Sequence, residues 1–261
     1  MQLKNARILL TGATGGLGRE LARQLSVSGA QLLLAGRDNA RLAELSGSLP
    51  TLCSSVRADL MRPEGIAAVA GAAREFGINV LINNAGVGNF ALFDAQEWDT
   101  VEQVLATNLA APLRLTHALL PLLKAQPEAA IVNIGSTFGS LPFPGFAAYS
   151  AAKAGLRGFS QALRRELADS RIAVIHFAPR AIDTPLNSDS VVALNRALGN
   201  RADSAAVVAT QMVAALRRDR AERHFGFPER LFAWLNGIAP SLIDRGLSGK
   251  LPVVKRFAHT P

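Results

Sequence analysis

Short apolar runs alternate with amphipathic stretches along the chain from residue 6 onward. Each run is bounded by glycine, proline or polar residues, which is the pattern of strands buried on both faces of a sheet. Between the runs, apolar residues recur at helical spacing, for example in 18–29 and 63–77. The runs predict six strands, at 6–12, 31–36, 51–60, 79–86, 129–136 and 171–179.

Regular alternation of strands and helices predicts a parallel sheet, because a parallel crossover needs a dozen or more residues. Helices should then cover both faces, which gives a doubly wound α/β fold. A helix is expected at 204–222 and a short seventh strand at 223–228. No linker rich in proline, glycine or serine divides the chain, so we expect one domain over residues 1–261.

Composition narrows the class of protein. Among the 261 residues, 49% are hydrophobic and 18% charged, which fits a large core and excludes disorder. The net charge is +8, but the Lys and Arg residues are scattered rather than grouped, so no nucleic-acid site is expected. A single cysteine, Cys53, rules out an internal disulfide. The N-terminus enters a strand directly and the uncharged run 129–152 is broken by polar residues. We therefore expect a cytoplasmic protein.

The first predicted strand ends in "TGATGGLG", residues 11–18, and a helical pattern follows at once. Glycines let the backbone turn sharply and approach a pyrophosphate, whose charge the helix N-terminus favours. Between the first strand and first helix of a βαβ unit, this pattern indicates a dinucleotide site. The loop residues expected to contact the cofactor are Gly12, Thr14, Gly15, Gly16, Leu17 and Gly18.

The second predicted strand indicates which dinucleotide is bound. NAD sites usually place an acidic residue at its end, whereas an arginine suits the 2′-phosphate of NADP. Gly36 leaves that position empty and Arg37 follows, so NADP is favoured over NAD. Asp38 complicates this reading, although it more simply caps the next helix. Asp59, beside Leu60, either binds the adenine or caps the helix that begins near Pro63.

Five motifs stand in order along the chain: "TGATGGLG" (11–18), "NNAG" (83–86), Asn108 in "NLAAP", Ser136 in "IGSTFG" and "YSAAK" (149–153). Together they resemble the short-chain dehydrogenase/reductase family. The resemblance spans residues 6 to about 185 in the family's order, with 13 positions between Ser136 and Tyr149, and it implies a Rossmann-type sheet of seven strands.

Tyr149, the only tyrosine of the chain, lies four residues before Lys153 and therefore on the same face of one helix. A phenol has an ordinary pKa near ~10, and a nearby ammonium favours the phenolate. We expect Tyr149 to protonate the oxygen of a carbonyl during reduction and to act as the base in the reverse direction. Ser136 should donate a hydrogen bond to the same oxygen.

The resemblance implies further roles. Lys153 would bind the nicotinamide ribose, and Asn108 would position a relay water or, alternatively, only kink its helix. "NNAG" would pack against the cofactor through Asn83, Ala85 and Gly86, or form a structural turn. After the sixth strand, the family pattern implies contacts to the nicotinamide end from Pro179, Ile182 and Thr184.

Two features depart from the family's pattern. Arg180 stands where a glycine is usual, and its side chain points away, reaches a phosphate or meets an acidic group of the substrate. The tail 229–258 reads as short amphipathic helices and follows an expected substrate-binding region, 180–228. It forms a lid, a subunit interface or a peripheral membrane contact; lid and interface are favoured.

The expected substrate is a small hydrophobic carbonyl or alcohol. Loops 86–93, 137–146 and 183–190 carry little charge, and two or three of their phenylalanines should face it. Those phenylalanines are Phe90, Phe93, Phe138, Phe143 and Phe146. The expected function is hydride transfer with NADP(H), in a homodimer or homotetramer without a metal. The alternatives are a non-catalytic NADP-binding sensor or scaffold, and an epimerase or dehydratase that uses the same Tyr–Lys pair.

Overall fold

A computed structural model describes residues 1–218, 222–224, 226 and 229–258. Its central sheet has seven parallel strands in the order β3-β2-β1-β4-β5-β6-β9, which confirms the predicted fold class. The strands are β1 Arg7–Thr11, β2 Gln31–Gly36, β3 Cys53–Arg57, β4 Val80–Asn83, β5 Ala129–Ile134, β6 Ile172–Ala178 and β9 Glu222–His224. Two further short strands, β7 Ile182–Asp183 and β8 Asp203–Ser204, pair with each other. Residues 225, 227 and 228 of the predicted seventh strand lie outside the described residues.

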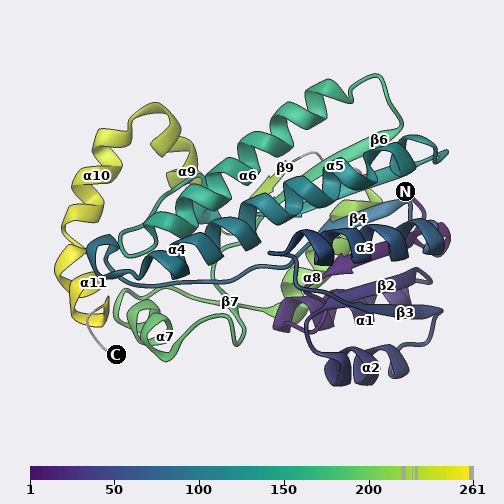
Figure 1. The fold of residues 1–261 in the computed structure, drawn as a ribbon. Coiled ribbons are helices and arrows are strands. Elements are labelled where there is room, and N and C mark those ends of the chain that lie inside the picture. The colour runs from purple at the N-terminus through teal and green to yellow at the C-terminus, as the bar shows by residue number, and fades with distance from the viewer. Residues whose placement is uncertain (219–221, 225, 227–228, 259–261) are drawn as a thin grey trace.

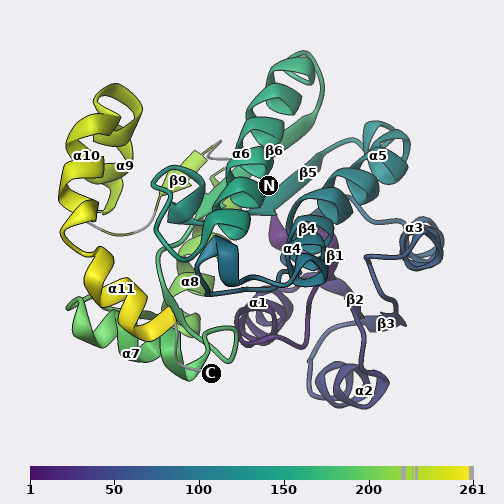
Figure 2. The ribbon, with the colours of Figure 1, turned by 60° about the vertical axis from the view of Figure 1, so that its left-hand side comes forward.

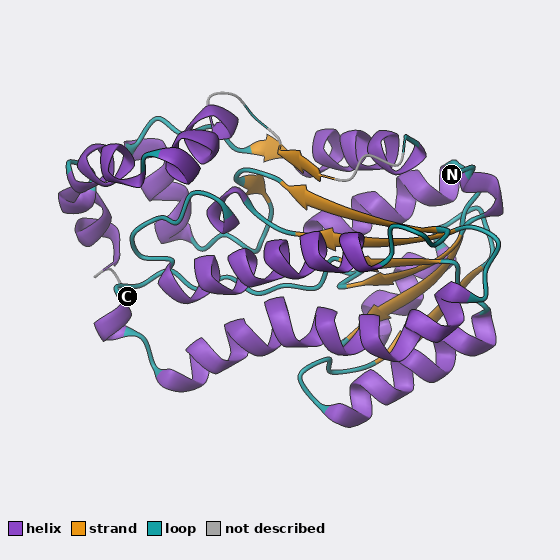
Figure 3. Ribbon diagram, turned by 90° about the horizontal axis from the view of Figure 1, so that it is seen from above, coloured by secondary structure: helices purple, strands orange, loops and turns teal. Residues whose placement is uncertain are grey.

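Helices follow the strands along the chain and lie on both faces of the sheet (Figures 1 and 3). They are α1 Gly16–Val27, α2 Asn39–Gly47, α3 Pro63–Phe76, α4 Trp98–Leu105, α5 Ala111–Lys124, α6 Ala147–Glu166, α7 Asp189–Ala197, α8 Ala205–Arg217, α9 Glu229–Ile238, α10 Pro240–Ser248 and α11 Leu251–Ala258. A π-helical turn, Ala106–Ala110, joins α4 to α5. Short 3₁₀ turns lie at Leu3–Asn5, Phe93–Ala95 and Thr137–Gly139.

Neighbouring residues of each central strand point into opposite halves of the core. In β1, Leu9 packs among buried residues of α3, α5 and α6, while Ile8 and Leu10 pack among those of α1 and α8. All three are fully buried. Because successive side chains of a strand face opposite sides, an unbroken apolar run such as "RILLT" is compatible only with a sheet covered on both faces.

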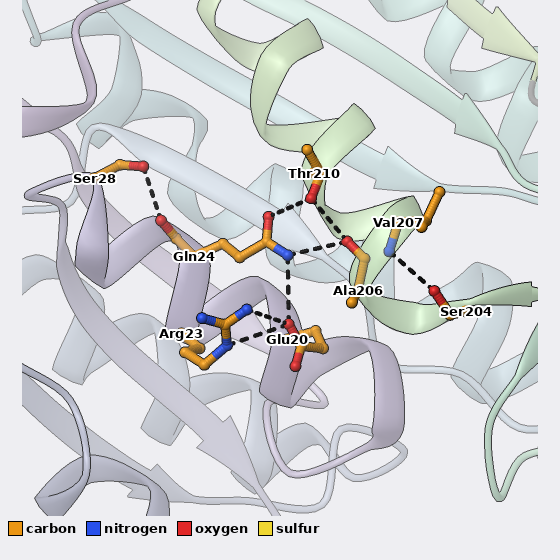
Figure 4. Close-up of polar contacts among 8 residues, drawn as sticks. All are labelled: Glu20, Arg23, Gln24, Ser28, Ser204, Ala206, Val207 and Thr210. Carbon is orange, nitrogen blue, oxygen red and sulfur yellow. Dashed lines mark hydrogen bonds and ion pairs between the residues drawn. The ribbon is translucent and has the colours of Figure 1, made fainter.

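Helix α8 returns from the far end of the chain to lie beside α1 (Figure 4). The Gln24 side chain links them: its amide nitrogen donates to the carbonyl of Ala206 at 3.0 Å, and its oxygen accepts from the Thr210 hydroxyl at 3.1 Å. Ser204 caps α8 by accepting a hydrogen bond from the N–H of Val207. The contact between α1 and α8 therefore fixes the position of strand β8, which immediately precedes α8.

The tail folds into three helices, as its amphipathic pattern predicts. Helices α9 and α10 lie side by side at one end of the molecule, away from the sheet, and α11 lies against α7 (Figures 1 and 2). Ile243 of α10 and Val254 of α11 are buried. Within the described residues, no helix has the length and hydropathy needed to cross a membrane.

The strand order reverses between β1 and β4, since β2 and β3 lie on one side of β1 and β5, β6 and β9 lie on the other side of β4. In open parallel sheets, ligands bind outside the carboxyl ends of the strands at such a switch point. The glycine-rich loop, "NNAG" and Ser136 all follow strands that end there.

Candidate active site

The turn after β1 leaves no room for side chains. Gly12 has a φ of +61°, in the left-handed region, and a Cβ there would lie 2.7 Å from the Cα of Ala85. A Cβ on Gly16 would lie 2.7 Å from the side chain of Thr184, and one on Gly18 would collide with the Gly12 carbonyl oxygen. The glycines therefore bring the N-terminus of α1 close to the sheet, where its free N–H groups suit a phosphate.

Asn84 attaches the end of β4 to this loop. Its side-chain amide donates to the carbonyls of Thr11 and Gly12 at 2.9 and 3.1 Å. The Thr11 hydroxyl in turn accepts hydrogen bonds from the backbone N–H groups of Asn84 and Ala85, both at 3.0 Å. "NNAG" thus holds the glycine-rich loop in place from the neighbouring strand.

Two arginines line the end of the cleft beside β2. Arg37 and Arg41 are both exposed. Asp38 accepts a hydrogen bond from the N–H of Arg41 at 3.1 Å and caps α2, as predicted. Asp59 also lines the cleft; its carboxylate accepts from the N–H of Met61 at 3.0 Å and does not cap α3. Two arginines, of which Arg41 also pairs with Asp38 at 3.5 Å, therefore line the cleft next to the position that an NAD site would give to an acid.

Tyr149 and Lys153 lie one turn apart on α6, and both face the cleft. The Lys153 ammonium is 5.6 Å from the centre of the Tyr149 ring and donates a hydrogen bond to the Ile134 carbonyl at 2.9 Å. Ser136, two residues after the end of β5, lies close enough to Tyr149 for its hydroxyl to lower the pKa of the phenol. The structure therefore brings the hydroxyls of Ser136 and Tyr149 together beside a buried cation.

Burial governs the protonation of both α6 groups. It raises the pKa of the Tyr149 phenol, an effect that the hydrogen bond with Ser136 partly opposes. It lowers the pKa of Lys153 to about 8, because a charged amine is poorly solvated there. A nearby ammonium was expected to favour the phenolate, but desolvation shifts the pKa of Tyr149 in the opposite direction.

Asn108 occupies the π-helical turn between α4 and α5 and is fully buried. Its side chain pairs with the backbone of Val87, donating to the carbonyl at 2.8 Å and accepting from the N–H at 3.0 Å. A Cβ on Gly86 would lie 2.9 Å from its oxygen. Such π-turns are rare and occur frequently at functional sites. Asn108 thereby fixes the loop that follows "NNAG" against the cleft.

Aromatic rings form the wall of the cleft beside Tyr149. Phe138 stacks on Phe143 with ring centres 5.6 Å apart, and it lies 4.9 Å from Phe146. Phe138 and Phe146 each present an edge to Tyr149 at 6.3 Å. These phenylalanines and Phe90 line the cleft, while Phe93 is exposed and lies apart from it.

The sequence leaves the role of Arg180 open, and in the structure its guanidinium pairs with two carboxylates, Asp203 and Glu229. Its guanidinium donates two hydrogen bonds to Asp203 of β8, at 2.6 and 2.8 Å, and a longer one to Glu229 of α9, at 3.5 Å. All three side chains are between 20% and 30% exposed. Asp203 is the largest cause of a raised Arg180 pKa, so the guanidinium stays charged. The residue therefore joins the loop after β6 to the tail.

One continuous cleft of about 1580 Å³ brings together almost all the predicted site residues. They are Gly12, Thr14, Gly15, Gly16, Leu17, Gly18, Arg37, Asp59, Leu60, Ala85, Gly86, Asn108, Ser136, Tyr149, Lys153, Pro179, Ile182 and Thr184. The exception is Asn83, which is 3% exposed and donates a hydrogen bond to Asn133 at 2.8 Å within the sheet. The cleft exceeds the usual size of a single-ligand pocket, so it has room for a dinucleotide and a substrate.

Sequence reasoning missed three groups of residues that line the cleft. Asn84 has the hydrogen-bonding role described above, and only its place after a buried strand could have indicated it. Arg41 follows Arg37 by four positions, a spacing that is visible in the sequence. Residues of α7, among them Val191, also contribute, and the tail, a candidate lid from the sequence, adds Phe232 of α9 and Leu247 of α10.

Comparisons with known proteins agree with this geometry. Residues 6–194 match the family model for short chain dehydrogenases. The chain is 32% identical over 279 residues to dehydrogenase/reductase SDR family member 7B of Bos taurus, covering 99% of this chain and 85% of that protein.

Two solved structures are similar over nearly their whole length. A short-chain dehydrogenase from Sphingobium yanoikuyae in complex with NADPH has a TM-score of 0.77 and 30% identity, covering 92% of this chain and 95% of that one. The bulky-bulky ketone specific alcohol dehydrogenase from Comamonas testosteroni has a TM-score of 0.76 and 26% identity, covering 92% and 94%. The chain thus belongs to the short-chain dehydrogenase/reductase family of NAD(P)-dependent oxidoreductases.

Proposed function

We propose that this protein transfers a hydride between NADP(H) and a bulky hydrophobic ketone, aldehyde or alcohol, with Tyr149 as the general acid and base. One observation carries the proposal: the hydroxyls of Tyr149 and Ser136 lie close together in the cleft that the aromatic wall and the glycine-rich loop also line. A carbonyl oxygen placed between the two hydroxyls would receive two hydrogen bonds. The carbon of that carbonyl would then face the space between the aromatic wall and Lys153.

Tyr149 supplies the proton. Its raised pKa keeps the phenol protonated at neutral pH, which is the form that carbonyl reduction requires. Ser136 stabilises negative charge as it develops on the oxygen, and its hydrogen bond moderates the effect of burial on Tyr149. In alcohol oxidation the same phenol must lose its proton, so that direction requires more alkaline conditions.

Lys153 and Asn108 position the groups that react. The Lys153 ammonium lies in the cleft beside the Tyr149 ring, where it stabilises the phenolate left after proton transfer and binds ribose hydroxyls. Asn108 holds the loop after "NNAG" through both hydrogen bonds to Val87. The oxygen and the nitrogen of the Asn108 side chain already have backbone partners at Val87. A relay water would therefore contact backbone groups of the loop that Asn108 holds in place.

The residues lining the cleft fit a dinucleotide. When bound, the nicotinamide cofactor supplies or accepts the hydride. Side chains at Gly12, Gly16 and Gly18 would collide with neighbouring protein atoms, so only glycines allow this loop, whose free N–H groups would receive the pyrophosphate. Arg37 and Arg41 provide positive charge for a 2′-phosphate, and Asp38 is engaged in capping α2, so NADP is preferred to NAD. Asp59 and Leu60 line the same cleft and would contact the adenine.

The substrate is hydrophobic and large. Four phenylalanines line the cleft around Tyr149, and the tail adds Phe232, Leu235 and Leu247 to its lining. Apolar walls with few polar anchors select for hydrophobic surface rather than for charged groups. The similarity to an alcohol dehydrogenase specific for bulky-bulky ketones supports the same class of substrate.

The test is NADPH oxidation by the purified protein with a panel of ketones and aldehydes graded by size and polarity. We expect turnover with bulky apolar carbonyls, weaker turnover with small or charged ones, and a lower KM for NADPH than for NADH. Phe143→Ala should shift the preference among bulky ketones, because it removes part of the stacked wall. NADPH binding without turnover of any carbonyl would favour a sensor or scaffold instead.

A further inference from the structure

Helix α9 has two different faces. On one, Glu229 accepts a hydrogen bond from Arg180 at 3.5 Å, and the Asn236 side chain donates to the Ser140 carbonyl at 3.0 Å. Phe232, on the same side, lines the cleft. This face attaches the helix to the body of the protein, as the lid interpretation of the tail requires.

The other face of α9 is apolar and turned to solvent. Leu231, Trp234 and Ile238 follow helical spacing and are 48%, 63% and 62% exposed. Leu242 of α10 and Phe232, which is 43% exposed although it also lines the cleft, complete what we name the tail patch. These five are among only twelve exposed large apolar side chains in the described residues, and all lie within twelve positions. Such clustering marks an interaction surface.

The tail patch is continuous with the mouth of the cleft. Phe232 and Leu242 are both more than 40% exposed, yet both also line the cleft. Helices α9 and α10 stand side by side at the end of the molecule, so neither the sheet nor the helices on its faces cover them there (Figure 2). Whatever covers the tail patch therefore adjoins the opening through which a substrate enters.

Charge around the patch indicates what covers it. The exposed basic residues of the tail are Arg230, Arg245, Lys250, Lys255 and Arg256. Against them stand Asp244 and Glu229, and Glu229 is already paired with Arg180. An exposed apolar helix face in a tail with more basic than acidic residues fits the surface of an anionic bilayer. A second copy docked by two-fold symmetry would instead bring two basic tails together.

We propose that helices α9 and α10 dock on the surface of an anionic lipid bilayer, with Leu231, Trp234 and Ile238 inserted at the level of the headgroups. The mouth of the cleft then faces the bilayer, and a hydrophobic substrate passes from the lipid between Phe232 and Leu242. That route rests on the proposed function, whereas the docking itself does not. Within the described residues no helix can span a membrane, so the contact is peripheral.

Sedimentation with vesicles tests the docking. The full chain is incubated with vesicles of phosphatidylcholine alone, or of phosphatidylcholine with phosphatidylglycerol, at low and high salt. The test variant carries Leu231→Ser, Trp234→Ser and Ile238→Ser. A matched control carries Val27→Ser, Leu52→Ser and Trp98→Ser, at positions that are 68%, 59% and 63% exposed outside the tail.

We expect the wild type and the control to bind the anionic vesicles, and the tail variant to bind at least about tenfold more weakly. Arg245→Glu with Lys255→Glu should also weaken binding by about tenfold or more, and high salt should reduce it. In a Trp98→Phe background, the emission of Trp234 should shift to the blue on addition of anionic vesicles, since the indole leaves water.

Two results would overturn the proposal. One is equal vesicle binding by the wild type and the tail variant, or no binding by either. The other is a change of oligomeric state in the tail variant while the wild type ignores vesicles, which would assign the patch to contact between copies. NADPH oxidation of a water-soluble ketone, measured without vesicles, reports separately on the proposed function.

Discussion

The guanidinium of Arg180 and the carboxylate of Asp203 are joined by two hydrogen bonds, at 2.6 and 2.8 Å, between segments 23 residues apart. Asp203 lies in β8. This strand pairs with β7, which begins two residues after Arg180. The same arginine reaches Glu229 at the start of α9. A position that the family usually gives to glycine is thus used here to attach the tail to the cleft.

Arg180→Met should lower the free energy of unfolding by about 1–3 kcal/mol, because it removes charge-assisted hydrogen bonds to a largely buried carboxylate. Urea unfolding of the full chain measures this. Asp203→Asn should cost a similar amount, and the double variant should cost less than the two effects added together. Arg19→Met is a matched control, because its pair with Glu44 is much more exposed and should contribute little. Additive losses from the two single variants would show that the pair does not act as a unit.

Arg37→Ala should weaken NADPH binding by about tenfold to a hundredfold and leave NADH binding nearly unchanged, since one charge-assisted contact contributes about 1.5–3 kcal/mol. Equilibrium titrations of both cofactors measure the effect. Arg23→Ala is the control: this arginine is exposed on α1 and does not line the cleft. An equal loss of affinity for NADH would remove the 2′-phosphate role.

Lys153 should make the stability of the protein rise with pH. Its pKa of about 8 lies below the ordinary 10.5, so between these values the unfolded chain binds the extra proton. Stability should therefore increase from pH 8 to pH 10.5, by about 3 kcal/mol for this group. Lys153→Met lacks the titrating amine. The unfolding free energy of the wild type minus that of this variant should therefore rise by the same amount between pH 8 and pH 10.5. A difference that stays constant with pH would contradict the burial of a charged amine.

The architecture and the catalytic pair could be predicted from the sequence because both follow from local patterns of residues. Unbroken apolar runs such as residues 6–12 indicate two-sided burial, and the four-residue spacing of Tyr149 and Lys153 puts them on one helix face. Asn83 and Asn84 could not be told apart, because successive residues at the end of a strand point in opposite directions. Only the sheet register shows that Asn83 turns into the core and Asn84 toward the glycine-rich loop.

Neither the long-range ion pairs of Arg180 nor the desolvation of Tyr149 and Lys153 could be predicted from the sequence. The partners of Arg180 lie 23 and 49 residues away, and nothing in the sequence around them marks the pairing. The charge of Lys153 near Tyr149 could be seen in the sequence, but desolvation could not. Desolvation is the largest cause of the pKa shift of both groups. The lid interpretation of the tail followed from its amphipathic pattern, but the division of α9 into two faces required the fold.

The most direct test of the central claim is the rate of carbonyl reduction by Tyr149→Phe. The variant keeps the ring and its edge contacts with Phe138 and Phe146, and loses only the hydroxyl. We expect NADPH to bind with wild-type affinity and kcat for the best ketone of the panel to fall by about a hundredfold to ten-thousandfold. A kcat within a few-fold of the wild type, with NADPH bound normally, would contradict the assignment of Tyr149 as the proton donor.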